Sequence, residues 1–479
     1  MTTDGPVLAI MGHPNAGKSS VVATLTENDR IDIDKRAGTT TISDEYPVII
    51  DGRTILKFID TPGFQNPTDI LEWFQAHQGQ TDLSGAFVSA HRDDPLFSHD
   101  RALLEPISRG AGIILVVDGS KRIKEKDRTE MELLRLTGRP RMAILNNLTS
   151  NRKHMPAWQD ALSRTFNSVR EFNAHRATYD ERIRLLQALK GIDQRWEARL
   201  EATIDAFERD WQRRIDQTAN TIMTLLKDAL SFKVSRTLRV DDITNDAERA
   251  LIRDRLSEAF EDGLRRLEVE AQTQIRAHFR HHVWNPPPES LLHKDLFSDD
   301  VDRSLGLNRH QMLLAGVAGG AATGGIIDLG VGGLSFGTGA LIGAVTGGAL
   351  SAFGSTALAK VDMQRRLGIE NFSMGPVTNP RFPFVLLDRS ILYCARAMNW
   401  SHGRQAADEE APDRVPDKRL TKKRGFTEGL DRDEHKALAK FFAAARRGRE
   451  SSQEPRCREI LGQVLRDLSE SRIDSRLGL

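Results

Sequence analysis

The chain has 479 residues, and this length predicts about two to four domains rather than one. Hydrophobic residues make up 39% and charged residues 28%, a composition that excludes wholesale disorder. Sixty-eight basic and sixty-seven acidic residues leave a net charge of +1, so we expect no nucleic-acid partner. Cys394 and Cys457 cannot form a disulfide framework. The first residues have no basic run followed by an apolar run, so we expect no secretory signal. We therefore expect a reduced, cytoplasmic protein.

Residues 6–175 alternate short apolar runs with helical patterns, which is typical of a doubly wound α/β domain. We assign residues 1–177 to this domain. The expected strands are Val7–Met11, Tyr46–Ile50, Ile55–Asp60, Ile113–Asp118, Met142–Asn146 and Val169–Asn173. The expected helices are 18–27, 69–79, 99–109, 125–137 and 156–165. Asp51-Gly52-Arg53 is typical of a hairpin turn and predicts one antiparallel edge in an otherwise mostly parallel sheet with helices on both faces.

From about residue 178 the apolar residues recur every three or four positions. One apolar stripe runs from Ile192 to Leu226, and a second amphipathic segment covers 246–282. This pattern predicts an all-α stalk or bundle over 178–310, in preference to a coiled coil. Three histidines near its end have the spacing of metal ligands, but a solvated helix end explains them better.

Residues 311–360 form a different kind of segment, rich in glycine. Asp328 is the only charged residue in 312–359, and fourteen glycines fall between Gly316 and Gly354. Small residues allow two backbones to approach closely, so we expect a helical hairpin. Two interpretations stay open: the hairpin enters or docks on a membrane, or it is buried against the stalk.

Three further segments complete the chain. Residues 361–401 are expected to be a return segment that leads the chain away from the hairpin. The charged, Pro-containing segment 402–433 is expected to be a linker. Two amphipathic helices, at 434–449 and 455–470, are expected in the C-terminal region 434–479.

A complete phosphate-binding loop follows the first expected strand. Gly12-His13-Pro14-Asn15-Ala16-Gly17-Lys18-Ser19 has the pattern G-x-x-x-x-G-K-S and opens a helix. Backbone N–H groups from Gly12 to Ser20 are expected to surround the phosphates, because a helix N-terminus favours anions. Lys18 is expected to bridge the β- and γ-phosphates, and the Ser19 hydroxyl to bind Mg²⁺.

Two more segments are expected to contact the γ-phosphate and the metal ion. Asp60 ends the third strand in Asp60-Thr61-Pro62-Gly63, where the carboxylate would hold Mg²⁺ and the Gly63 N–H would reach the γ-phosphate. The polar loop Gly38-Thr39-Thr40-Thr41 lies between the motifs. We assign Thr40 to Mg²⁺, with Thr39 beside the nucleotide and Thr41 as the alternative ligand.

These motifs resemble the TrmE–Era branch of P-loop GTPases, related to the 50S ribosome-binding GTPases. Pro14-Asn15-Ala16-Gly17-Lys18-Ser19-Ser20 and the Gly-Thr-Thr loop carry the resemblance. It implies GTP and GDP as ligands, a K⁺ ion held by Asn15, and a hydrophobic residue, Phe64, in place of a water-positioning glutamine. The expected catalytic residues are Lys18, Thr40, Gly63 and Asn15. A homodimer of G domains is a further expected assembly.

The base-reading motif departs from the pattern of such GTPases. Asn146-Asn147-Leu148-Thr149 stands where Asn-Lys-x-Asp is expected, so Thr149 replaces the carboxylate that accepts from guanine. A charged acceptor is worth ~1.5–3 kcal/mol per hydrogen bond, and its loss predicts weaker discrimination for guanine. Asn146 and Asn147 stay base-side candidates, with Asn173 and Ala174 as the backbone contact.

The wider chain resembles a bacterial family that joins such a GTPase domain to a C-terminal domain of unknown function. The Leu-Asn-Asn-Leu-Thr-Ser segment, the stalk and the Gly-rich stretch carry this likeness. We expect a K⁺-stimulated GTPase switch whose helical region meets the inner face of the cell membrane. The alternatives are a dynamin-like membrane remodeller, a ribosome- or RNA-binding assembly factor, and a nucleotide-binding scaffold that does not hydrolyse.

Overall fold

The structure, a computed structural model, describes most of the chain. The described residues are 6–28, 44–147, 151–174, 177–239, 245–282, 295–297, 359, 361–366, 369–400, 402 and 425–469. Several expected features lie outside them: Thr39, Thr40 and Thr41, Thr149, all of the Gly-rich segment but Ala359, and 403–424 of the linker. The chain divides into two compact units. Unit 1 is Met1–Arg214, Phe279–Asn285 and Met398–Ala411, and unit 2 is Ile215–His278, Pro286–Ala397 and Pro412–Leu479.

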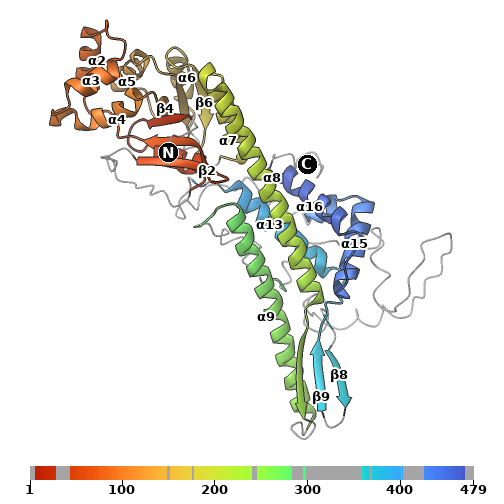
Figure 1. The fold of residues 1–479 in the computed structure, drawn as a ribbon. Helices are drawn as coiled ribbons and strands as arrows, with labels where there is room; N and C mark the ends of the chain where they lie inside the picture. The colour runs from red at the N-terminus through yellow and green to blue at the C-terminus, as the bar shows by residue number, and fades with distance from the viewer. Residues whose placement is uncertain are drawn as a thin grey trace. The chain divides into compact units, whose positions relative to one another are not determined.

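Unit 1 is built on a six-stranded sheet in the order β2-β3-β1-β4-β5-β6 (Figure 1). Its strands are β1 (Val7–Met11), β2 (Asp44–Ile50), β3 (Arg53–Asp60), β4 (Gly112–Asp118), β5 (Arg141–Asn146) and β6 (Ser168–Phe172). Its helices are α1 (Lys18–Thr26), α2 (Pro67–Ala76), α3 (Leu83–Ala90), η1 (Pro95–Phe97), α4 (Ser98–Ser108), α5 (Glu125–Leu136), α6 (Met155–Ser163) and α7 (Tyr179–Lys190). The expected α/β class with a mostly parallel sheet is confirmed.

The sheet is buried on both faces. Side chains alternate along β1, so that Leu8 and Ile10 pack with α1, α7 and the first half of α8 (Gln194–Ser231). Ala9 and Met11 pack on the opposite face, with α2 to α6. The predicted antiparallel edge is confirmed by the β2–β3 pairing. Asp51 and Gly52 both have positive φ, 51° and 74°, as a tight hairpin turn requires.

Between β3 and β4 the chain forms a helical insert, which we define as α2, α3, η1 and α4 (residues 67–108). Two helices were predicted here, at 69–79 and 99–109, and α3 was missed. α3 has only eight residues, a length that gives little periodic pattern. Its start is fixed by Asp82, whose carboxylate accepts from the Gly85 N–H, and its buried Leu83 and Phe87 join the core of this face.

The long helix predicted from the apolar stripe is α8, and it belongs to both units. Leu200, Ile204 and Phe207 lie in the core of unit 1, although residues from 178 onward were expected in the stalk. Beyond Arg214 the helix belongs to unit 2. The apolar stripe therefore serves two cores in succession.

Unit 2 contains helices and a small sheet. The helices are the rest of α8, α9 (Asp246–His278), α13 (Phe382–Asn399, through Ala397), η3 (Phe426–Gly429), α15 (Arg432–Arg446) and α16 (Glu454–Ser469). β7 (Val234–Arg239), β9 (Ile369–Met374) and β8 (Val361–Arg366) form an antiparallel sheet in the order β7-β9-β8 (Figure 1). Sequence analysis did not anticipate this sheet, because its strands have only six residues each and β7 lies far from β8 and β9 in the chain. Phe372 of β9 packs on Ile252 and Leu256 of α9.

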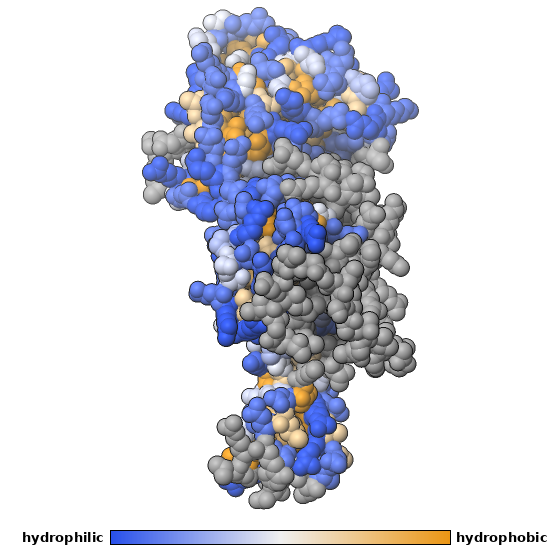
Figure 2. Space-filling view, turned by 90° about the vertical axis from the view of Figure 1, so that its right-hand side faces the viewer, coloured by the Kyte–Doolittle hydropathy of each residue, from blue (hydrophilic) through white to orange (hydrophobic). Residues whose placement is uncertain are grey.

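α13 is the most deeply buried helix of unit 2, and its polar residues have partners. Arg389 pairs with Glu268 of α9, and Asp388 accepts from the N–H and the hydroxyl of Thr427 at 2.7 and 2.9 Å. The described residues on the face seen in Figure 2 are mostly hydrophilic, with some apolar residues showing between them. Among the described helices, none combines the length and the apolar character needed to cross a membrane.

Candidate nucleotide site

The predicted phosphate and base residues lie at one edge of the unit 1 sheet. β1, β3, β4, β5 and β6 are parallel neighbours, so their carboxyl ends meet there. Gly12 to Ser20 follow β1, Asp60 to Gly63 follow β3, Asn146 and Asn147 follow β5, and Asn173 and Ala174 follow β6. The fold thus gathers four segments whose outermost residues, Gly12 and Ala174, are 162 residues apart in the chain.

The phosphate loop has a geometry that depends on glycine. Gly12 has a φ of 136°, and a Cβ there would lie 2.1 Å from the Val116 carbonyl oxygen of β4. Gly17 has a φ of 89° and precedes the first turn of α1. The Lys18 ammonium donates to the carbonyls of Gly12 and His13 at 3.0 and 3.3 Å, so it lies folded over the loop. Burial lowers its pKa, and the charge of Asp60 opposes that shift.

Ser19 and Asp60 lie side by side and fit a magnesium ion. The Ser19 hydroxyl donates to Asp60 Oδ2 at 3.3 Å, while Asp60 Oδ1 is buried and has no hydrogen-bond partner among the described residues. Burial raises the pKa of Asp60 to about 6, against the lowering effect of the Lys18 charge. A buried carboxylate with an unsatisfied oxygen beside a hydroxyl is the donor set that a hard cation needs. Their oxygens would hold Mg²⁺.

The segment after Asp60 is held on both sides of Gly63. Thr61 donates its N–H and its hydroxyl to the Ile10 carbonyl at 3.2 and 2.8 Å. A Cβ on Gly63 would lie 3.4 Å from the Gly12 carbonyl oxygen, so this glycine touches the phosphate loop. The Phe64 ring is buried in the core, and its carbonyl accepts from Lys126 of α5 at 2.9 Å. Phe64 therefore fixes the segment after Asp60 to the core of this face of the sheet.

One carboxylate of the helical insert holds the next two residues. Asp100 of α4 is fully buried and accepts from the Gln65 N–H at 2.9 Å and the Asn66 N–H at 3.4 Å. Its second oxygen accepts from the Asn66 side-chain amide at 3.1 Å.

His13, which sequence analysis gave no role, links the phosphate loop to α5. Its Nε2 lies 2.7 Å from Asp127 Oδ1 and 3.6 Å from Glu130 Oε1. Burial raises the pKa of Glu130 to about 7, against the lowering effect of the His13 charge. The back of the phosphate loop is thus braced by an acidic pair that the sequence pattern did not reveal.

The base side of the site is braced by Asn146. This side chain is fully buried; its amide donates to the Ala16 carbonyl at 2.9 Å and its oxygen accepts from the Ala174 N–H at 3.4 Å. Asn173 donates to the Asn147 carbonyl at 2.6 Å, and Asn147 Oδ1 is buried without a partner in the described structure. Asn146 thereby joins the phosphate loop to the segment after β6, and Asn147 offers an acceptor close by.

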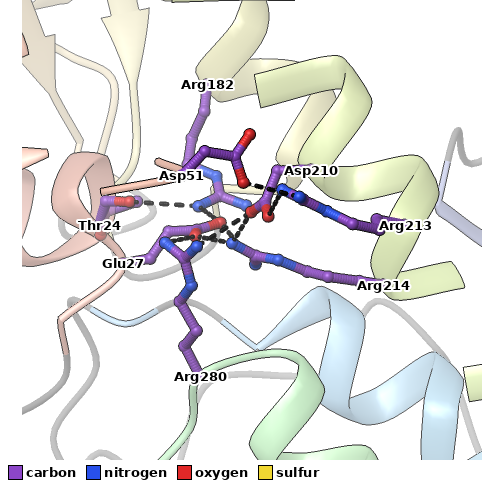
Figure 3. Close-up of polar contacts among 8 residues, drawn as sticks. All are labelled: Thr24, Glu27, Asp51, Arg182, Asp210, Arg213, Arg214 and Arg280. Carbon is purple, nitrogen blue, oxygen red and sulfur yellow. Dashed lines mark hydrogen bonds and ion pairs between the residues drawn. The ribbon is translucent and has the colours of Figure 1, made fainter. Parts of the chain in front are cut away.

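The far end of α1 carries a buried ionic cluster, which we call the Glu27 cluster: Glu27, Arg182, Asp210, Arg214 and Arg280. Glu27 is the C-cap of α1, with a φ of 53°, and its side chain is 2% exposed. Arg182 of α7 and Arg280 donate to it at 2.6 and 3.2 Å, and Arg214 of α8 contacts both of its oxygens (Figure 3).

Burial alone would raise the pKa of Glu27, but the charges of Arg214 and Arg182 outweigh it and hold the pKa well below its usual range. Asp210 accepts from both Arg214 and Arg280. Arg213 and Asp51 extend the cluster toward solvent at 2.7 Å (Figure 3). All of these residues belong to unit 1.

The predicted residues that the structure describes therefore lie at the strand ends, and Asn15 is exposed with a φ of 64°. Sequence reasoning missed Asp100, His13 with its acidic partners, and Glu27. Only Glu27 has a local signal, as a glutamate directly after the phosphate-loop helix, and that signal is weak because such positions are usually solvated.

The comparisons with known proteins agree with this geometry. Residues 7–147 match the model of the 50S ribosome-binding GTPase family, and residues 159–466 match the model of a domain of unknown function, DUF3482.

The chain belongs to the DUF3482 family.

Known relatives of this DUF3482 protein match its GTPase domain. The tRNA modification GTPase MnmE of Exiguobacterium sibiricum is 34% identical over 140 residues, which is 29% of this chain and 30% of that protein. GTPase Der of Rhodopirellula baltica is 40% identical over 84 residues, 17% of this chain and 18% of that protein. The matched part thus spans less than a third of either relative's length. The N-terminal domain is a GTP-binding GTPase domain of the class that contains MnmE and Der.

Among solved structures, the chain is similar to Era in complex with MgGDPNP and a segment of 16S ribosomal RNA. That similarity has 17% identity, covers 36% of this chain and 52% of the Era chain, and has a TM-score of 0.26.

Proposed function

We propose that this DUF3482 protein binds GTP with Mg²⁺, hydrolyses it to GDP, and uses the nucleotide cycle to switch its helical region. Water attacks the γ-phosphorus in this class of reaction, and the protein contributes position and charge rather than a side-chain nucleophile. Lys18 would neutralise charge on the phosphates, the Gly63 N–H would donate to the γ-phosphate, and Ser19 and Asp60 would hold Mg²⁺. When bound, the metal ion neutralises charge that develops on the phosphate oxygens.

The observation that carries the hydrolysis proposal is the meeting of the phosphate loop with Asp60. Asp60 Oδ1 is buried and has no hydrogen-bond partner among the described residues, while the Ser19 hydroxyl donates to the other carboxylate oxygen at 3.3 Å. Leaving such an oxygen unsatisfied costs about 1–3 kcal/mol unless a ligand occupies it. A nucleotide-bound cation would remove this cost.

Phosphate release from GTP by the purified full-length chain tests this proposal. We expect turnover that needs Mg²⁺ and is lost in Asp60→Ala. Tight nucleotide binding with no phosphate release would instead support the scaffold alternative.

We further propose that K⁺ stimulates hydrolysis, with Asn15 as a ligand. Asn15 is exposed, has a φ of 64° in the left-handed region, and lies within the loop that would surround the phosphates. The expectation is faster release in KCl than in NaCl for the wild type, and equal rates for Asn15→Ala. Equal rates for the wild type would contradict the K⁺ proposal.

The coupling to the helical region would run through α1. This nine-residue helix begins at Lys18 and ends against Glu27, so it is ~14 Å long. The phosphates would bind at its first turn, and its C-cap holds arginines from three separate segments. Arg214 is the last residue of α8 in unit 1, and Arg280 follows α9 by two residues. Two of the arginines on this carboxylate therefore adjoin, along the chain, the helical residues that DUF3482 contributes to unit 2.

Hydrogen exchange in the GDP state and with a non-hydrolysable GTP analogue tests the coupling. We expect a nucleotide-dependent difference in α8 of the wild type, and its loss in Glu27→Gln, which removes the charge. Asp51→Asn is the matched control, because it removes only the exposed Arg213 pair of the same region. An undiminished difference in Glu27→Gln would contradict coupling through this residue.

The membrane part of the expectation concerns 312–359 and is also a proposal. Its support is the composition of that segment, which has Asp328 as its only charge. Fractionation of cells that express the tagged wild type or a deletion of 312–359 tests it. We expect membrane partitioning of the wild type alone, and a wild type found only in the supernatant would contradict it.

A further inference from the structure

Asp100 is a fully buried carboxylate whose partners are all in the segment that follows Gly63. It lies in the first turn of α4, 37 residues after Gly63, and no sequence motif marks it. It accepts three hydrogen bonds: from the backbone of Gln65 at 2.9 Å, the backbone of Asn66 at 3.4 Å and the side chain of Asn66 at 3.1 Å. Two consecutive backbone N–H groups therefore converge on one carboxylate.

These donors have few alternatives. Gln65 and Asn66 precede α2, which starts at Pro67. Their backbone N–H groups therefore have no hydrogen-bond acceptor within that helix. Asn66 also donates to the Leu96 carbonyl at 3.1 Å, which ties the same residue to η1 of the helical insert. A buried carboxylate that accepts backbone N–H groups makes charge-assisted bonds about twice as strong as neutral ones. The insert therefore holds Gln65 and Asn66 firmly.

Gly63 is two residues from the first of these bonds. On its other side, Thr61 is tied to β1 through the Ile10 carbonyl. Phe64 is fixed by its buried ring and by Lys126. The backbone of Gly63 thus lies in a short span between two fixed points, next to Gly12 of the phosphate loop.

We propose that Asp100 is a positioning residue for GTP hydrolysis, which sets the place of the Gly63 N–H against the γ-phosphate from the helical insert. This inference rests on the proposed use of GTP. Asp100 does not touch the nucleotide; it acts through Gln65 and Asn66. Because a displacement of ~1 Å in a reacting group can cost about 100-fold in rate, a residue of this kind affects turnover without contacting substrate.

The competing interpretation is that Asp100 only caps the start of the insert. Two variants separate the interpretations. Asp100→Ala removes all three bonds. Asp82→Ala is the matched control, because Asp82 caps α3 in the same insert through the Gly85 N–H and has no contact with residues 61–66 among the described hydrogen bonds.

For full-length Asp100→Ala we expect GDP affinity within twofold of the wild type. We expect affinity for a non-hydrolysable GTP analogue to fall about fivefold or more, since one donor to the γ-phosphate is displaced. The turnover number should fall about 10- to 100-fold. Asp82→Ala should leave all three quantities unchanged, even where its thermal midpoint falls as far as that of Asp100→Ala.

Asp100→Asn extends the test and replaces Asp100→Ala if that variant does not fold. It keeps one acceptor but places an amide against the Asn66 amide. We expect an intermediate loss of turnover, because the bonds from the two backbone N–H groups can remain while the bond from the Asn66 side chain is lost. Unchanged analogue affinity and turnover in the Asp100 variants would overturn the proposal.

The analogue-to-GDP affinity ratio needs no hydrolysis. A wild type without turnover would therefore contradict the proposed function, while a ratio lowered in Asp100→Ala would still support the positioning role.

Discussion

The two ends of helix α1 satisfy their polar groups in opposite ways. At the first turn, Ser19 and Asp60 leave a buried carboxylate oxygen without a partner in the described structure, and Lys18 bonds only to loop carbonyls. At the C-cap, Glu27 is surrounded by Arg182, Arg214 and Arg280. One end is incomplete until a ligand binds, and the other is complete within the protein.

This difference in hydrogen bonding distinguishes a ligand-binding site at the first turn from a structural contact at the C-cap. Unsatisfied buried groups cost free energy, so a folded protein keeps them where a ligand offsets the cost. A fully paired carboxylate gains nothing from a ligand, but removing it leaves its partners buried and uncompensated. Substitutions at the first end should therefore change binding, and substitutions at the second should change stability and coupling.

The largest expected effect is on nucleotide binding at the first end. Lys18→Ala removes the cation that would face the phosphate charges, so we expect no measurable GTP or GDP binding by calorimetry. The thermal midpoint of the free protein should change little, because the hydrogen bonds of Lys18 within the described structure go to loop carbonyls. Retained nucleotide affinity would show that the phosphates lie elsewhere.

The next effect is on stability at the other end. Glu27→Ala removes the buried carboxylate that pairs with Arg182 and Arg214, and leaves Arg214 only its bond to Asp210 among the described residues. We therefore expect a loss of about 3–5 kcal/mol in denaturant unfolding of the cooperative transition that includes unit 1. A loss below ~1 kcal/mol would indicate that the arginines find other partners.

The pH dependence of that loss sharpens the comparison. The pKa of Glu27 is depressed in the folded protein, because the charges of Arg214 and Arg182 outweigh the effect of burial. Its stabilisation is therefore complete above the ordinary glutamate pKa of about 4.3 and is lost as the pH falls through the folded value. The difference between wild type and Glu27→Gln should be constant from about pH 7 to 5 and shrink only in stronger acid. A difference that shrinks already near neutral pH would contradict the ionised cluster.

A smaller effect is expected at the base side. Thr149→Asp would restore a charged acceptor where the pattern of such GTPases has one, and it should favour guanine over inosine nucleotides by ~1.5–3 kcal/mol. Competition titrations on both proteins measure this. An unchanged ratio would mean that Thr149 does not face the base, and the buried, unpartnered Asn147 Oδ1 would become the next candidate acceptor.

The smallest effect is expected from the exposed part of the Glu27 region. Asp51→Asn removes an ion pair with Arg213 in which the side chains are 65% and 47% exposed, so we expect at most ~1 kcal/mol of lost stability. Unfolding under the conditions used for Glu27→Ala provides the comparison. A loss as large as that of Glu27→Ala would erase the distinction between the buried and exposed pairs.

The sequence by itself determined the features that depend on local pattern. The phosphate loop, Asp60-Thr61-Pro62-Gly63, the α/β order of unit 1 and the apolar stripe of α8 are each readable within a short stretch, because glycine geometry and helical or strand periodicity are local. The class of GTPase domain followed from the same motifs and agrees with the family matches.

Only the tertiary structure decided the partners of the buried polar groups. Asp100 meets Gln65 across 35 residues, Glu27 meets Arg214 across 187 and Arg280 across 253, and β7 pairs with β9 across the whole Gly-rich segment. No local pattern encodes such pairs, because the sequence around a carboxylate does not show whether the carboxylate is solvated or buried. Burial is set by the packing of distant elements, and burial is what makes the pairing of a charge obligatory.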